Sequence, residues 1–169
     1  MISYYFGSKE ALLKTLIEER VSSLEEVVEN IAAGIPETAL EKLKRIADRY
    51  IYIFLFERPF HQLLMQEISL KSRPALCQFI IDIWMRNGRF IVQIIKAGIK
   101  SGEFCKVDPE LMVPTIVGTI NQLCKNTAIT SELLNLKGGN EAFRDPKLQK
   151  RLSVHMHQLL EAMLLPATS

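Results

Sequence analysis

The chain has 169 residues, of which 48% are hydrophobic, and its 21 Lys+Arg and 19 Asp+Glu residues leave a formal net charge of +2 at pH 7. A chain of this size and hydrophobicity buries a core of its own, so the composition excludes intrinsic disorder and a fold that depends on disulfides or metals. The near-neutral balance also excludes a broad basic surface for nucleic acid, although it permits local contacts.

The cysteines and the hydropathy pattern indicate a cytoplasmic protein without a membrane partner. Cys77, Cys105 and Cys124 share no CxxC spacing, which argues against a disulfide framework or a zinc ribbon. The longest uncharged stretch, residues 111–124, is shorter than the run of about 20 residues that crosses a bilayer. The N-terminus lacks the apolar core of a secretory signal.

The first predicted element is a long amphipathic helix over about residues 9–33. Apolar side chains recur three and four residues apart from Leu13 to Ile31, which marks one stripe of a helix. Ser8 can cap its start, and Gly34 suits the left-handed position that often follows a helix.

The second predicted helix starts at Pro36–Glu37 and continues to Phe56. Proline is favoured in the first turn, where its missing N–H costs nothing. Residues 50–56 are apolar in every direction and could be a buried strand, but the helical spacing from Leu40 continues into them without interruption, so we predict a helix.

The second half continues the helical pattern. A helix is predicted over residues 74–100, and two further helices begin at Asp108–Pro109 and Asp145–Pro146, where the aspartate caps and the proline presets φ. The last of these ends at Pro166. Residues 126–145 lose the periodicity, so a surface loop is predicted there. With no strand pattern in the sequence, the predicted fold class is all-α.

Two segments resemble the TetR family of transcriptional regulators. Residues 4–13, YYFGSKEALL, resemble the family's segment that closes the DNA-binding domain and opens the linking helix. Residues 97–104, AGIKSGEF, followed by VDPE at 107–110, resemble the turn before the first helix of the family's dimer interface. The resemblance covers nearly the whole chain in helix order.

The resemblance implies that residues 1–7 are a remnant of the recognition helix and that residues 8–169 form a ligand-binding and dimerisation domain. About forty to fifty residues of the family's DNA-binding domain have no counterpart, so the chain is expected to be a fragment or to have a misplaced start, and it cannot read base edges as written. Tyr5 and Lys9 match positions that contact the DNA backbone in an intact protein; alternatively they pack locally or are solvated.

The implied function is a ligand-responsive transcriptional regulator, expected to be a repressor, that acts as a homodimer, takes a small hydrophobic or amphipathic effector and needs no cofactor. Operator DNA is a partner of the intact protein only. The alternative is a stand-alone helical module for ligand binding or dimerisation without DNA binding.

Aromatic and polar residues on the central helices are the candidates for the ligand pocket, although aromatic residues at helical spacing are more often core. The candidates, led by Trp84 and Asn121, are Tyr50, Phe54, His61, Met65, Trp84, Asn87, Phe90 and Asn121.

The last two long helices are the candidates for a four-helix dimer interface, with a wholly intramolecular core as the alternative. Gly118 permits close approach of a partner helix. The candidate interface residues are Val117, Gly118, Leu152, Met156, Leu159 and Met163.

Nothing in the sequence favours an enzyme. No phosphate loop, nucleophile elbow or HExxH motif is present. His157 and Glu161 share a helix face and amount to half a metal site, which alone is weak, so we predict no metal and no catalytic residues. Glu103 and Lys106 are expected to be solvated charges.

Overall fold

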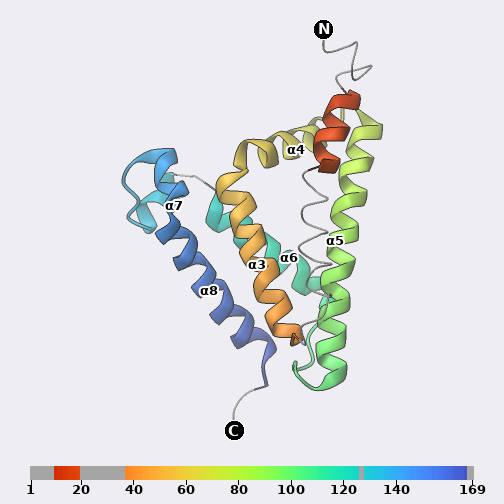
Figure 1. Ribbon diagram of the computed structural model, residues 1–169, viewed down its shortest axis with the longest axis vertical. Helices are drawn as coiled ribbons and strands as arrows, with labels where there is room; N and C mark the ends of the chain where they lie inside the picture. Colours follow the sequence, from red (N-terminus) through yellow and green to blue (C-terminus); the bar gives the residue numbers. More distant parts are fainter. Residues whose placement is uncertain (1–9, 20–36, 126–127, 167–169) are drawn as a thin grey trace. The chain divides into compact units, whose positions relative to one another are not determined.

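The computed structural model describes residues 10–19, 37–125 and 128–166, and these ranges contain helices and no strand. The all-α prediction is therefore confirmed. Residues 10–19 are helical, as predicted for them, and the rest of the helix predicted over 9–33 lies outside the described residues. The later helices are α3 (Ala39–Phe56), α4 (Arg58–Leu70), α5 (Pro74–Ser101), α6 (Pro109–Cys124), α7 (Ala128–Leu133), the 3₁₀ helix η1 (Gly139–Arg144) and α8 (Pro146–Leu164) (Figure 1).

The starts of α6 and α8 follow the predicted aspartate–proline pairs. The Asp108 carboxylate accepts a hydrogen bond from the backbone N–H of Leu111 at 3.0 Å, and Asp145 accepts one from the N–H of Lys147 at 2.8 Å. The proline after each aspartate occupies the first turn of its helix. These local caps satisfy backbone N–H groups that have no partner within the helix, so both predicted boundaries are confirmed.

The predicted start of α3 at Pro36–Glu37 was wrong. Thr38 is the N-cap: its hydroxyl accepts from the N–H of Glu41 at 3.2 Å, and the Glu41 carboxylate accepts from the N–H of Thr38 at 2.8 Å. Glu37 therefore precedes the helix, and Pro36 lies outside the described residues. A reciprocal capping box provides hydrogen-bond acceptors for two backbone N–H groups, whereas a proline in the first turn only lacks an N–H group that would need an acceptor.

The loop predicted over residues 126–145 was also wrong in part, because this segment contains α7 and η1. Both are too short to show a helical period in the sequence. Tertiary contacts hold them: Thr130 and Phe143 are buried, and the Arg151 guanidinium donates a hydrogen bond to the Leu134 carbonyl. Gly138, the residue before η1, has a φ of 115°, a left-handed conformation that favours glycine.

The described residues belong to two compact units. The first contains residues 10–19 and 62–89, and the second contains residues 37–61 and the described part of 90–166. Helices α4 and α5 contribute residues to both units. No helix in the described ranges is long and apolar enough to cross a membrane.

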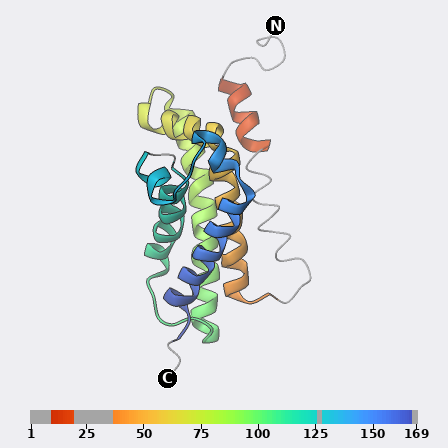
Figure 2. The ribbon, with the colours of Figure 1, turned by 90° about the vertical axis from the view of Figure 1, so that its left-hand side faces the viewer.

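In the second unit, α3 packs against both α8 and α6. Helices α3 and α8 lie side by side and run in opposite directions, as both ribbon views show (Figure 1 and Figure 2). The sequence analysis predicted that the apolar faces of α6 and α8 pack against each other. In the structure, each of these faces is largely buried against α3. The buried side chains are Leu43, Ile46, Ala47, Ile51, Phe54 and Leu55 of α3, Met112, Ile116 and Ile120 of α6, and Leu148, Leu152, Met156, Leu160 and Leu164 of α8.

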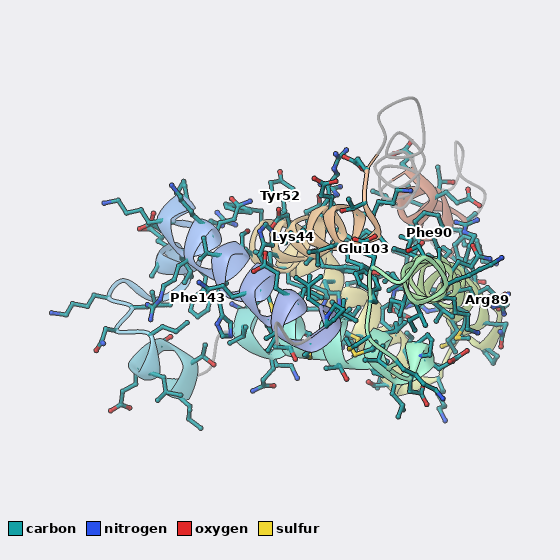
Figure 3. The ribbon with its side chains drawn as sticks, turned by 90° about the horizontal axis from the view of Figure 1, so that it is seen from below. Lys44, Tyr52, Arg89, Phe90, Glu103 and Phe143 are labelled. Carbon is teal, nitrogen blue, oxygen red and sulfur yellow. The ribbon has the colours of Figure 1, made fainter. Side chains whose placement is uncertain are left out.

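The turn between α5 and α6 also holds the start of α3. Both oxygens of the Glu103 carboxylate accept backbone N–H groups there, from Ala39 at 2.9 Å and from Leu40 at 2.8 Å (Figure 3). The prediction that Glu103 is a solvated charge was therefore wrong, because the contact joins residues far apart in the sequence. Lys106 is exposed, as predicted.

In the first unit, a buried carboxylate joins α4 to the start of α5. Glu67 is 4% exposed, and its Oε1 forms an ion pair with Arg73. The Cys77 thiol donates to the Glu67 carbonyl at 3.1 Å. The ion pair lowers the cost of burying the Glu67 charge, and the thiol contact ties the backbone of α4 to α5, so this turn is held by polar contacts as well as by packing.

Candidate functional site

An aromatic and histidine cluster lies where α3 ends and α4 begins. Tyr50 and Phe54 are one turn apart on α3, with ring centroids 5.8 Å apart, and the His61 ring stands edge-on to Phe54 with a centroid distance of 4.4 Å. The chain turns between the two helices at Glu57, whose carbonyl accepts the N–H groups of Phe60 and His61. We call Tyr50, Phe54 and His61 the corner cluster.

Burial shifts the pKa of both titratable members of the corner cluster. Loss of hydration lowers the pKa of His61 from 6.5 to about 4, with a smaller contribution from the positive charge of Lys125. The imidazole is therefore neutral at pH 7 and can donate one hydrogen bond and accept another. Burial also raises the pKa of the Tyr50 phenol to about 12, so that its hydroxyl stays protonated.

Two cations approach this region from different elements. Arg58, the first residue of α4, places its guanidinium carbon 5.9 Å from the centre of the Phe143 ring, a cation–π distance. The same cation acts on the thiol of Cys124. Burial raises the pKa of this thiol to about 12, and the positive charge of Arg58 lowers it by a smaller amount. Lys125, directly after α6, acts on His61. Phe143 is buried in η1 and is labelled in Figure 3.

The structure brings only some of the predicted pocket residues together. Tyr50, Phe54 and His61 form the corner cluster. Asn121 is half-buried on α6 in the same unit, and its carbonyl accepts the backbone N–H of Lys125 at 3.0 Å. Phe90, also in the second unit, is half-buried on α5. Met65, Trp84 and Asn87 belong to the first unit; Met65 is 38% and Trp84 37% exposed.

Sequence reasoning missed the contact of Arg58 with Phe143 and the effects of Arg58 on Cys124 and of Lys125 on His61. Each joins residues of different elements, and no spacing connects them. Phe143 could have drawn attention as an aromatic residue in an otherwise polar segment. The two cations carried no signal, because Lys and Arg near helix ends are ordinary surface residues.

The candidate interface residues differ in what they contact. Leu152 and Met156 are buried in the core of their own chain, whereas Val117, Leu159 and Met163 are half-buried and Gly118 is exposed. A Cβ added at Gly118 would meet nothing within 4 Å. The half-buried and exposed members are the ones with surface left for a partner. The dimer itself stays a prediction.

The polar residues considered for a metal site pair with other side chains. His157 Nε2 lies 2.9 Å from Asp48 Oδ1, and Glu161 forms an ion pair with Lys44 (Figure 3). These two contacts join α8 to α3. Within the described ranges, no group of three or more His, Cys, Asp or Glu side chains converges as metal ligands would. The predicted DNA-backbone residues, Tyr5 and Lys9, lie outside those ranges.

No protein-family model and no curated protein matches the chain. Among solved structures, the chain is similar to the transcriptional regulator FadR from Bacillus subtilis, a TetR-family protein crystallised in complex with stearoyl-CoA. The two share 26% sequence identity with a TM-score of 0.63, and the match covers 94% of this chain and 78% of that chain. The fold therefore resembles that of a ligand-binding TetR-family regulator, which is not an enzyme.

Proposed function

We propose that this chain is the effector-binding and dimer-forming body of a ligand-responsive transcriptional regulator, most simply a repressor. The likeness to FadR over 94% of the chain is the observation that carries the proposal. In such a protein, a ligand changes the relative stability of two conformations of the regulatory body and so changes DNA binding elsewhere in the intact molecule. DNA contacts by Tyr5 and Lys9 belong to this proposal for the intact protein.

We propose further that the effector is an amphipathic molecule with a long apolar chain, of the fatty acyl type. Support comes from the stearoyl-CoA bound by the similar protein and from the corner cluster. Ligand sites for apolar molecules combine aromatic walls with a few polar groups that orient the ligand. Tyr50 and Phe54 supply aromatic surface, and the neutral His61 imidazole supplies a hydrogen-bonding group beside it.

Direct binding measurements test the effector. Calorimetric titration of stearoyl-CoA into the purified chain should show saturable binding at micromolar concentration or below, and the fluorescence of Trp84, the one tryptophan of the sequence, can be followed in the same titration. Phe54→Leu should weaken binding several-fold, because it removes an aromatic face and keeps much of the volume. His155→Gln, at an exposed position on α8, is the matched control. A folded protein that shows no saturable binding by fluorescence or calorimetry would refute the proposal.

We propose that the homodimer forms through the half-buried and exposed surface of α6 and α8. Val117, Leu159 and Met163 offer apolar area, and Gly118 leaves room for a partner helix. Light scattering should give twice the chain mass at micromolar concentration. Val117→Glu should shift the population to monomer, because a charge would be buried without a partner. Leu70→Glu, on the exposed surface of the first unit, should not.

A further inference from the structure

Helix α4 buries a carboxylate and exposes large apolar side chains. Glu67 is 4% exposed, whereas Leu70, three residues later, is 62% exposed, and Leu63 and Met65 are exposed as well. A helix that only packs on its own chain shows the opposite arrangement, with apolar side chains inward and charged ones in water. The inward position of Glu67 therefore calls for a partner of its carboxylate.

Only one oxygen of this carboxylate has a partner in the part of the chain that the structure describes. Glu67 Oε1 forms the ion pair with Arg73, while Oε2 is buried and accepts no hydrogen bond from any described residue. Glu37 Oε2 has no partner of this kind either, but Glu37 begins the described range 37–125, so only part of its neighbourhood is described. A buried acceptor without a donor is destabilising, so Glu67 Oε2 marks a position for a molecule that supplies an O–H or N–H group.

The buried residues that accompany Glu67 on α4 and α5 are apolar. Leu64, three residues earlier on the same face of α4, is buried. The Cys77 thiol lies 3.1 Å from the Glu67 carbonyl oxygen, and Ile80, three residues further along α5, is buried too. A polar group beside buried apolar side chains is the arrangement that orients a mostly apolar ligand.

The charge balance favours an uncharged donor. Arg73 already balances the negative charge of Glu67, so a ligand cation would leave a net positive charge in a buried position, which is costly. A hydroxyl group supplies one hydrogen-bond donor and no charge.

We propose that the first unit binds an apolar molecule with a hydroxyl group, and that Glu67 Oε2 accepts the hydrogen bond of that hydroxyl. This site is separate from the corner cluster, whose residues belong to the second unit, so neither proposal depends on the other. Water also supplies an O–H donor to a buried acceptor, so the experiment has to separate a ligand from water.

The experiment uses three probes with the same ten-carbon chain. Decanol has an O–H donor, decyl methyl ether has an oxygen without a donor, and decylamine is a cation at pH 7. Calorimetry measures each probe against the wild type, Glu67→Gln and Asp82→Asn. The last variant is the matched control, because Asp82 is an exposed carboxylate of the same unit. Circular dichroism establishes that each variant is folded.

In the wild type, decanol should bind about tenfold more tightly than decyl methyl ether, as for a hydrogen bond to a charged group, and decylamine no more tightly than the ether. In Glu67→Gln the amide oxygen remains opposite Arg73, which places the NH₂ group where Oε2 was. A donor there serves the ether oxygen as well, so the preference for decanol should fall below about twofold. Asp82→Asn should keep the tenfold preference.

Methyl NMR locates the bound decanol. The signals of Leu64 and Ile80, in the first unit, should shift and saturate with the same affinity as the calorimetry gives. Those of Ile51 and Leu152, in the second unit, should shift less. Shifts confined to the second unit would overturn the proposed site.

Equal binding of decanol and the ether to the wild type overturns the role of Glu67 without any variant, and so does a preference that a folded Glu67→Gln retains. Tighter binding of decylamine than of decanol overturns the uncharged donor. If none of the probes binds saturably, water is the donor to Oε2 and the site is refuted. Stearoyl-CoA is titrated separately, so its binding or failure to bind bears on the proposed effector alone.

Discussion

Gly98 on α5 leaves no room for a side chain, so Gly98→Ala should destabilise the protein even though alanine favours helices. A Cβ built at Gly98 lies 2.3 Å from Cδ2, 2.5 Å from Cε2 and 2.9 Å from Cγ of Phe104. Carbon atoms in contact are normally about 3.5–4.0 Å apart, so the ring would have to retreat by more than about 1 Å. Phe104 is 3% exposed, and its N–H donates to the Gly98 carbonyl at 3.0 Å, so ring and turn resist that movement together.

Two opposing effects determine how much Gly98→Ala changes the free energy of unfolding. Helix propensity favours alanine over glycine by about 1 kcal/mol. Overpacking of a core typically costs about 1–3 kcal/mol, and three close contacts with an immobile ring place this site at or above the upper end. We expect Gly98→Ala to lower the free energy of unfolding by about 2 kcal/mol, which for a chain of this size lowers Tm by about 4–8 °C.

Urea unfolding followed by circular dichroism measures this change. Gly118→Ala, measured on the monomeric chain, is the control: within the chain the added methyl meets nothing within 4 Å, so only helix propensity acts and stability should rise by up to about 1 kcal/mol. In Gly98→Ala/Phe104→Ala, the truncated ring makes room, so the cost of the methyl should disappear. A Gly98→Ala protein as stable as the wild type, or one whose cost adds to that of Phe104→Ala, would refute the steric explanation.

Three further outcomes are expected, all measurable by urea unfolding. Glu103→Ala should lower the free energy of unfolding by about 2 kcal/mol, because two N–H groups at the start of α3 lose a charged acceptor. Glu110→Ala, which removes an exposed ion-pair partner of Lys96, should lower it clearly less, and equal costs would contradict the capping role of Glu103. The pKa of His61 is about 4 in the folded protein and near 6.5 in the unfolded chain, so the unfolded state binds more protons between these two pH values. The free energy of unfolding should therefore fall by up to about 3 kcal/mol as the pH drops through this range. His61→Gln should remove this part of the pH dependence of stability. Met156→Ala should lower the free energy of unfolding by about 3 kcal/mol, because Met156 is buried. Met163→Ala, at a half-buried position, should lower it clearly less, and the reverse order would contradict the packing of α8 on α3.

Local sequence signals predicted most of the helices because they act over a few residues. Asp108 and Asp145 cap the helices that their own neighbours form, so spacing alone located α6 and α8. At α3 two local signals competed, and the capping box of Thr38 prevailed over the earlier proline. The short helices α7 and η1 escaped prediction because they are held by contacts with distant residues.

The candidate site likewise contains residues that the sequence could bring together and residues that it could not. Tyr50 and Phe54 share a helix face, so the sequence could place them together, and His61 follows by one turn of the chain. The contact of Arg58 with the Phe143 ring joins α4 to η1, so no local spacing in the sequence could indicate it.

By itself the sequence determined the fold class, the starts of α6 and α8 and the resemblance to a regulator family, because periodicity, caps and short motifs are formed by neighbouring residues. Only the tertiary structure decided that Met156 belongs to the core, that Glu103 holds the start of α3, and that Arg58 lies over the Phe143 ring. Each of these depends on residues far apart in the chain, where burial and charge are properties of the assembled molecule and not of any segment.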